Sequence, residues 1–319
     1  MTTVRFPNSV LQIEYIQAPL PGDELFARVG NTPLLPLRRI GAAFPQVEIY
    51  AKAEWFNPSG SVKDRAAREI ILTAEENGDL TSDKVLLDAT SGNMGIAYAT
   101  LCAARGYRVA LTLPSNASRE RIIALRALGV DLTLTDPLDG TDGAQLAARA
   151  LHAAKPDRYF YADQYNNAAN WQAHYRTTAP EIWQQTKGRI THFVVGLGTS
   201  GTMTGTGRRL KEYHSHIELI AVQPNSPLHG LEGLKHMPTA IKPGIYDPSV
   251  HDRILLISTE ETHVMIKRLA REEGLFVGIS AAAAAVAALK VAAQIECGVV
   301  VAVFPDNAYK YLSEKFWNE

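Results

Sequence analysis

The chain of 319 residues is 46% apolar and 20% charged, a globular composition that excludes a disordered or collagen-like protein. Its 32 Lys and Arg and 33 Asp and Glu residues give a net charge of −1, which predicts neither a nucleic-acid partner nor binding to an anionic membrane surface. Two cysteines, Cys102 and Cys297, are too few for a disulfide framework and favour a reduced, cytoplasmic setting. No secretory signal is predicted, and the longest apolar run, residues 281–289, is too short to span a bilayer.

Short runs rich in β-branched residues alternate with amphipathic stretches along most of the chain. The predicted strands, in chain order, cover residues 47–55, 85–90, 108–114, 130–136, 159–164, 192–198, 218–224, 253–258 and 299–304. The predicted helices begin near Lys63, Asn93, Ser118, Thr141, Ala169, Thr202, Thr259 and Ser280. Strands separated by single helices indicate parallel crossovers, so we expect an α/β fold with mostly parallel, buried sheets.

The strands fall into two groups, which predicts two doubly wound domains with helices on both faces of each sheet. The smaller domain is predicted at residues 47–166, and the larger domain at residues 1–46 plus 167–319. Residues 225–248 are rich in Pro, Gly and His with little periodicity, and a loop of this length is often functional. Residues 1–22 are interpreted as an extended arm or a partner contact.

Because ligands of open α/β sheets bind beyond the carboxyl ends of the strands, the loops there are the candidate sites. The first such loop is residues 57–65 (NPSGSVKDR), which place Lys63 in the first turn of the following helix. The positive partial charge at a helix N-terminus lowers an amine pKa, and only a neutral amine attacks a carbonyl. The loop therefore favours an imine-forming lysine, with a solvated surface lysine as the alternative.

The second loop is residues 90–95 (TSGNMG), where hydroxyl, amide and Gly residues begin a helix. Free backbone N–H groups at that point suit a carboxylate or a phosphate. The alternative is a helix that Thr, Ser or Asn simply caps.

The third loop, residues 196–201 (GLGTSG), matches the dinucleotide-binding pattern G-x-G-x-x-G. That pattern also needs an acidic residue at the end of the next strand, which here ends in AVQP at residues 221–224. The missing acid argues against a nucleotide-binding dehydrogenase, and glycines beside hydroxyls favour a cradle for a single phosphate.

The fourth loop, residues 278–280 (GIS), offers Ser280 either as a helix cap or as a hydroxyl that bonds a ligand. The four loops together provide a reactive amine, one phosphate cradle and a second anion site. Pyridoxal 5′-phosphate acting on an α-amino acid satisfies all three.

The segments 57–65, 90–95, 198–202 (GTSGT) and 278–280 resemble signature segments of the cysteine synthase and cystathionine β-synthase family. These are pyridoxal-phosphate enzymes of the tryptophan synthase β-subunit fold, fold type II. The similarity extends from about Gly30 to Ser313, and Asp306 looks more like cysteine synthase B than like the A branch. The resemblance implies that the cofactor binds in the cleft between the two domains.

The resemblance also implies a role for each matching position. Lys63 would carry the cofactor and then move the α-proton, Asn93 would contact the ring hydroxyl, and Ser280 would contact the pyridine nitrogen. The phosphate would be held by Gly198, Thr199, Ser200, Gly201 and Thr202. The substrate carboxylate would be held by Thr90, Ser91, Asn93, Met94 and Gln164. No metal ligands are implied.

The implied reaction is β-replacement on O-acetylserine or O-phosphoserine with sulfide or another sulfur donor, giving L-cysteine through an α-aminoacrylate. Ser280, being a hydroxyl, would not keep the ring nitrogen protonated, which suits β-elimination. A cation at Lys235 or His236 would favour a departing phosphate, with a solvated lysine as the alternative. Homocysteine giving cystathionine, or an amine giving a diaminopropionate-type product, remain open as acceptors. Residues 170–175 (NWQAHY) are similar to relatives that add an amine.

The resemblance further implies a cytoplasmic homodimer that takes a small amino-acid substrate and a sulfur donor. Serine acetyltransferase or a sulfur-carrier protein are partners of such enzymes. A non-catalytic relative that only binds a partner is the remaining alternative, and the intact Lys63 argues against it.

Overall fold

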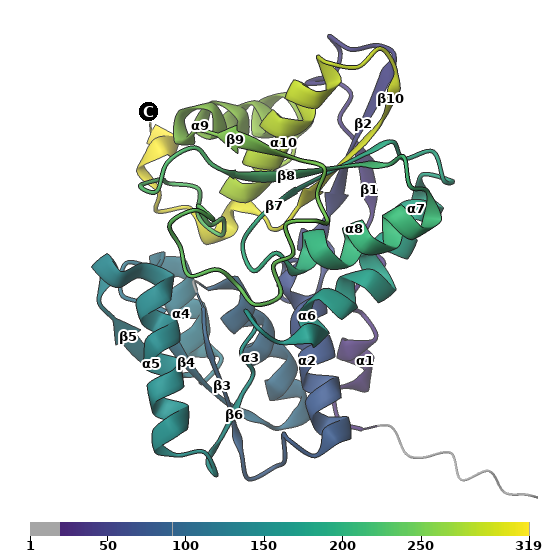
Figure 1. The fold of residues 1–319 in the computed structure, drawn as a ribbon. Coiled ribbons are helices and arrows are strands. Elements are labelled where there is room, and N and C mark those ends of the chain that lie inside the picture. The colour runs from purple at the N-terminus through teal and green to yellow at the C-terminus, as the bar shows by residue number, and fades with distance from the viewer. Residues whose placement is uncertain (1–19, 91, 319) are drawn as a thin grey trace, which may run out of the picture.

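The computed structural model describes residues 20–90 and 92–318, so most of the predicted N-terminal arm lies outside the described residues. The chain forms two lobes, each built on its own sheet (Figure 1). One sheet has six strands in the order β1-β2-β10-β7-β8-β9, and the other has four in the order β5-β4-β3-β6. All neighbouring strands are parallel except the pair β1 and β2. The predicted α/β class with mostly parallel sheets is confirmed.

The six-stranded sheet is covered on both faces. Its strands are β1 (Leu34–Pro36), β2 (Val47–Ala53), β7 (His192–Gly196), β8 (Glu218–Pro224), β9 (Arg253–Ile257) and β10 (Gly298–Phe304). Val300 and Ala302 of β10 pack with the core under α9 (Thr259–Arg268) and α10 (Ile279–Ala292). Val301 and Val303 point to the opposite core, under α7 (Ala179–Gln185) and α8 (Gly201–Tyr213). Alternate residues of one strand thus enter two cores, which explains its unbroken apolar sequence.

The four-stranded sheet repeats this design at smaller size. Its strands are β3 (Val85–Ala89), β4 (Arg108–Pro114), β5 (Asp131–Thr135) and β6 (Tyr159–Tyr161). Leu86 of β3 packs with α2 (Lys63–Asn77) and α3 (Asn93–Arg105), and α4 (Arg119–Ala127) joins the same side. Leu87 packs with α5 (Gly140–Ala154) on the other face. The predicted helix starts agree with the structure to within one residue.

The strand β2 corrects the predicted grouping of the elements. This strand is predicted for the smaller domain, but it pairs in parallel with β10 from Val47 opposite Gly298 to Ala53 opposite Phe304. The chain therefore adds two strands, β1 and β2, to the larger sheet before it crosses to the smaller one. The short β1 and the single turn α1 (Asp23–Phe26) were not predicted, since elements of three or four residues show no periodicity.

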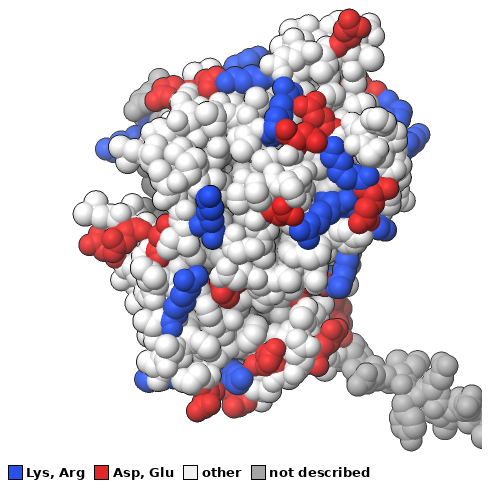
Figure 2. Space-filling model, in the orientation of Figure 1, with Lys and Arg blue, Asp and Glu red and all other residues white. Residues whose placement is uncertain are grey.

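The Ala-rich helix α10 is buried along residues 279–288. Its small side chains let the helix lie close to the six-stranded sheet, and this confirms the predicted buried helix. No helix within residues 20–90 and 92–318 is long and apolar enough to cross a bilayer. Figure 2 shows acidic and basic side chains intermingled over the visible face, in keeping with the net charge of −1.

A buried ionic network joins the two lobes. Arg65, on α2, donates from Nε to Glu54 Oε2 at 2.7 Å and from Nη1 to Glu181 Oε1 at 2.7 Å. Lys52, on β2, donates to Glu181 Oε2 at 2.7 Å. Since Lys52, Glu54 and Arg65 are at most 2% exposed, each charge depends on its partners for solvation. The network fixes α2 against β2 and α7.

Candidate active site

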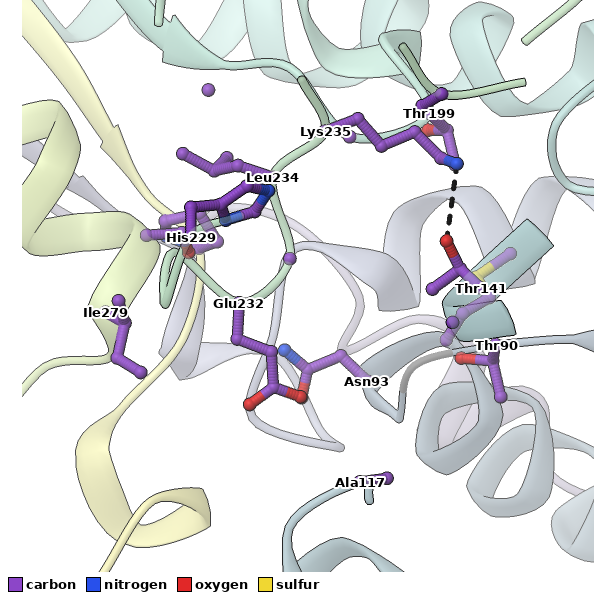
Figure 3. Close-up of a pocket in the computed structure, with 18 of the residues that line it drawn as sticks. Thr90, Asn93, Ala117, Thr141, Thr199, His229, Glu232, Leu234, Lys235 and Ile279 are labelled. Atoms are coloured by element: carbon purple, nitrogen blue, oxygen red, sulfur yellow. Dashed lines mark hydrogen bonds between the residues drawn. The ribbon is translucent and has the colours of Figure 1, made fainter. Parts of the chain in front are cut away.

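A pocket of about 580 Å³ lies between the two lobes, and the four candidate loops meet in it (Figure 3). Its lining includes Lys63, Thr90, Asn93, Met94, Gln164, Gly198, Thr199, Ser200, Thr202 and Ser280. Gly201 is the first residue of α8, directly after Ser200. Ser91 lies outside the described residues. The structure therefore brings the predicted side chains together from five separate segments of the chain, as expected for the carboxyl ends of parallel strands.

Lys63 is the first residue of α2 and is held against the end of the larger sheet. The backbone N–H of Val62 donates to the carbonyl of Pro305 at 2.8 Å, and Ser61 forms a β-bridge with Asp306. Burial lowers the pKa of the Lys63 amine, and Lys310 and Arg121 lower it further, whereas Asp306 raises it. Burial is the largest of these causes, whereas the prediction invoked the helix N-terminus.

The loop 198–202 has the form of an anion cradle at the start of α8. Ser200 adopts a left-handed conformation with φ of 71°, and its buried Oγ has no hydrogen-bond partner within the described part of the chain. At Gly198 a Cβ atom would lie 2.6 Å from the carbonyl oxygen of Gly233, so only glycine fits there. A buried hydroxyl without a partner beside free backbone N–H groups favours a phosphate ligand.

The loop 90–95 shows hydrogen bonds of the kind that the capping interpretation predicts. Thr90 Oγ1 accepts from the backbone N–H of Gly92 at 2.9 Å and of Gly95 at 3.3 Å, so it serves as a cap. Its own proton is left to donate into the pocket. Gln164 donates from Nε2 to the carbonyl of Ala89 at 2.6 Å, which fixes its amide beside the loop.

Asn93, on α3 of the smaller lobe, and Ser280, on α10 of the larger lobe, both line the pocket. Asn93 donates from Nδ2 to Asp306 Oδ2 at 2.7 Å, and its Oδ1 has no partner among the residues that the structure describes. Ser280 is the second residue of α10, whose N-cap position is Gly278, so Ser280 is not the predicted cap. Both side chains are available to a ligand between them.

The chain is similar to known proteins over most of its length. The family model described as pyridoxal-phosphate dependent enzyme matches residues 25–306. The chain belongs to this family. A cysteine synthase from Aquifex aeolicus is 50% identical over 297 residues, covering 91% of each chain. Cysteine synthase B from Salmonella typhimurium is 42% identical over 291 residues, covering 91% of this chain and 95% of the relative.

Solved structures of the pyridoxal-phosphate dependent enzyme family superpose well on this chain. O-ureido-L-serine synthase does so with a TM-score of 0.86 at 37% identity, over 92% of this chain and 94% of that one. The O-acetylserine dependent cystathionine β-synthase from Helicobacter pylori has a TM-score of 0.86 at 35% identity, over 92% and 98%. The predicted family, the fold type and the pyridoxal phosphate cofactor are confirmed, and the protein is an enzyme.

Two site residues of this family member were not predicted for the pocket. Asp306, flagged only as a branch marker, is fully buried and accepts from Asn93 and from Tyr311 Oη at 2.8 Å. Arg121, on α4, pairs with Glu232 and stacks over the Tyr311 ring at 4.7 Å. Their sequence neighbourhoods carry no glycine-rich signature, so only the fold places them at the pocket.

Lys235 lines the pocket, as it must if it faces a departing phosphate, but its positive charge is balanced by Asp142. Its Nζ lies 2.8 Å from Asp142 Oδ1 and 3.3 Å from Thr141 Oγ1 (Figure 3). His236 Nδ1 contacts Thr239 Oγ1 at 2.8 Å in an exposed part of the loop. The ion pair of Lys235 joins the loop 225–248 to α5 of the smaller lobe.

The buried carboxyl group of Asp88 is expected to make the stability of the enzyme depend on pH. Burial raises the pKa of Asp88 from 3.8 to about 7, against the lowering by hydrogen bonds from the backbone of Ala89 and Gln164. The folded state therefore holds a proton that the unfolded state has lost, and stability falls as pH rises from about 4 to about 7. Asp88→Asn should flatten this fall. Melting temperatures of both proteins across this range check it, and an equal fall in both would contradict it.

Proposed function

We propose that this enzyme is a cysteine synthase, which replaces the β-substituent of O-acetyl-L-serine with sulfide to give L-cysteine. The cysteine synthases of A. aeolicus and S. typhimurium support this proposal. The observation that carries it is that Lys63, with its lowered amine pKa, lines the same pocket as the cradle 198–202 and the loop 90–95.

The residues of the pocket fit pyridoxal 5′-phosphate. The cradle residues, with the unpartnered Ser200 Oγ, would hold the phosphate, and Asn93 Oδ1 would contact the ring hydroxyl. When bound, the cofactor supplies an electron-withdrawing ring that stabilises negative charge at the substrate Cα. Ser280 would contact the ring nitrogen with a hydroxyl, which would not keep that nitrogen protonated and would therefore favour β-elimination.

Lys63 would move the proton at Cα. Its lowered pKa keeps a fraction of the amine neutral, and only the neutral amine accepts a proton. Thr90, through its hydroxyl, would hold the substrate carboxylate together with Gln164 and the backbone at Asn93 and Met94. Ser91 belongs to the same proposed contact. These groups would orient the Cα–H bond toward the lysine.

The charge balance of the pocket favours an acetyl ester over a phosphate ester as the donor. The two further cations of the pocket, Arg121 and Lys235, each pair with an acid. The acidic residues that line the pocket are Asp139, Asp142, Glu232 and Glu314. A dianionic leaving group would therefore meet repulsion, whereas a neutral ester would not.

The donor preference is tested by the specificity constant, kcat/KM, with each ester. We expect O-acetylserine to exceed O-phosphoserine by about tenfold or more, about 1.4 kcal/mol in transition-state energy. Asp142→Asn should raise the relative use of O-phosphoserine several-fold because it leaves Lys235 without its acid. The exposed Asp157→Asn is the matched control. A wild-type preference for O-phosphoserine would contradict the donor assignment.

The nucleophile that replaces the ester group is proposed to be sulfide. Homocysteine and an amine are the alternatives, since O-acetylserine dependent cystathionine β-synthase shares the fold. Product analysis with equal concentrations of the three nucleophiles distinguishes them. A majority of cystathionine or of an aminated product would contradict the assignment of sulfide.

The domain boundary at residue 166, a cytoplasmic homodimer, and docking of serine acetyltransferase or a sulfur-carrier protein also remain proposals. The mass of the protein in solution tests the dimer. Binding assays with each purified partner test the docking of serine acetyltransferase and of a sulfur-carrier protein.

A further inference from the structure

The segment 168–178 packs against the start of α8 and carries polar side chains that the proposed reaction does not use. It begins as α6 (Ala168–Ala173) and continues as a π-helical turn (His174–Thr178). The approach to α8 is close, since a Cβ at Gly205 would lie 1.9 Å from the carbonyl oxygen of Trp171. Such π-helical turns inside helices frequently mark functional sites.

Asn170 and His174 are each 2% exposed, are spaced i and i+4, and reach the cradle. Asn170 donates from Nδ2 to Thr199 Oγ1 at 3.1 Å and to the carbonyl of Gln164 at 2.7 Å. His174 Nε2 lies 3.3 Å from Thr202 Oγ1, and its Nδ1 lies 2.9 Å from Thr178 Oγ1. Asn170 therefore contacts Thr199 of the cradle, and His174 contacts Thr202.

We propose that Asn170 and His174 are positioning residues that orient Thr199 and Thr202 so that both hydroxyls donate to the phosphate of the bound cofactor. This inference rests on the proposed function of the pocket. It differs from the predicted link between residues 170–175 and an amine acceptor, because the described contacts of these side chains are with the cradle.

The hydrogen bonds that Thr199 Oγ1 accepts support this orientation. Its Oγ1 accepts from Asn170 Nδ2 and also, at 3.4 Å, from the backbone N–H of Gly201. A hydroxyl oxygen has two lone pairs and one proton, so with both lone pairs engaged Thr199 can only donate. A phosphate dianion accepts hydrogen bonds and donates none, which matches that remaining proton.

Thr202 can donate to the phosphate while it is bonded to His174 only with one tautomer of that ring. Burial, together with the positive charge of Arg65, lowers the pKa of His174 to about 3, so the ring is neutral and carries one N–H. If Nε2 holds that proton, it donates to Thr202, and Thr202 donates to the phosphate. Nδ1 then accepts from the hydroxyl of Thr178. In the other tautomer, Nε2 would accept a hydrogen bond from the Thr202 hydroxyl. Thr202 would then present only a lone pair to the phosphate.

The test compares the binding of pyridoxal 5′-phosphate and of pyridoxal, which lacks the phosphate, to the apoprotein by visible titration. Thr178→Val removes the donor to Nδ1, and His174→Leu removes the ring. Each should weaken pyridoxal 5′-phosphate about tenfold and change pyridoxal less than about twofold. Thr178→Ser and His174→Gln keep the donors and should restore most of the affinity. Nitrogen NMR of the holoenzyme should show the proton of His174 on Nε2.

Equal losses for the two ligands would assign His174 a purely structural role and overturn the proposal. A proton found on Nδ1, or unchanged phosphate-dependent affinity in Thr178→Val, would also overturn it. A wild type that binds neither ligand would contradict the proposed function. A wild type that binds both, with no effect of the variants, would contradict only the positioning role.

Discussion

Lys63→Ala is expected to lower turnover about a thousandfold or more while the protein stays folded. Lys63 is proposed both to hold the cofactor and to move the α-proton, and no neighbouring side chain of the described pocket duplicates its position. The other lysine in the pocket, Lys235, is paired with Asp142. Borohydride treatment of the wild type, followed by mass spectrometry, should find the pyridoxyl group on Lys63 alone.

Two control variants separate chemistry from charge. Lys63→Arg keeps a cation at the start of α2 but cannot be linked to the cofactor, so it should be as inactive as Lys63→Ala. Lys155→Ala changes an exposed lysine beyond α5 and should leave turnover unaltered. A pyridoxyl group on another lysine, or substantial turnover by Lys63→Ala, would contradict the assigned role.

Arg65→Met is expected to lower the free energy of unfolding by about 3–5 kcal/mol. The substitution keeps an unbranched side chain in the space. It leaves the buried carboxylate of Glu54 and the partly buried carboxylate of Glu181 without their main partner. Lys52 compensates only in part, since it contacts Glu181 and the carbonyl of Thr32. Urea unfolding of both proteins measures the loss.

The matched control is Arg268→Ala, which breaks the exposed pair with Glu272 and should change stability little. Acid unfolding adds a second signature. Burial would raise the pKa of Glu54, but Arg65, Lys52 and Thr32 outweigh it and lower the pKa to about 2. The stabilisation is thus complete above about 4.5 and is lost as pH falls toward 2. Arg65→Met should lose this acid-dependent part. Equal stability of Arg65→Met and wild type would contradict the network's role.

Periodicity was enough to predict most elements of this fold, because buried parallel strands and amphipathic helices repeat with different spacing. It could not assign β2, since its pattern is that of any buried strand. The partner that decides its sheet, β10, lies about 250 residues away along the chain. Pairing at that distance leaves no local signal.

The same contrast holds at the pocket. Lys63 and the cradle were predictable because glycines and hydroxyls at the ends of strands form local signatures. Asp306, Arg121 and His174 act through contacts between elements far apart in sequence. For His174 the helical spacing from Asn170 was visible, but the element it faces was not.

The visible spectrum of the purified protein during the two half-reactions tests the central claim most directly. We expect a yellow protein whose band moves to longer wavelength on adding O-acetylserine, with release of one acetate per active site. Sulfide should then restore the original spectrum with formation of one L-cysteine per site. A protein that stays colourless after addition of pyridoxal 5′-phosphate, or a yellow protein whose spectrum ignores O-acetylserine, would contradict it.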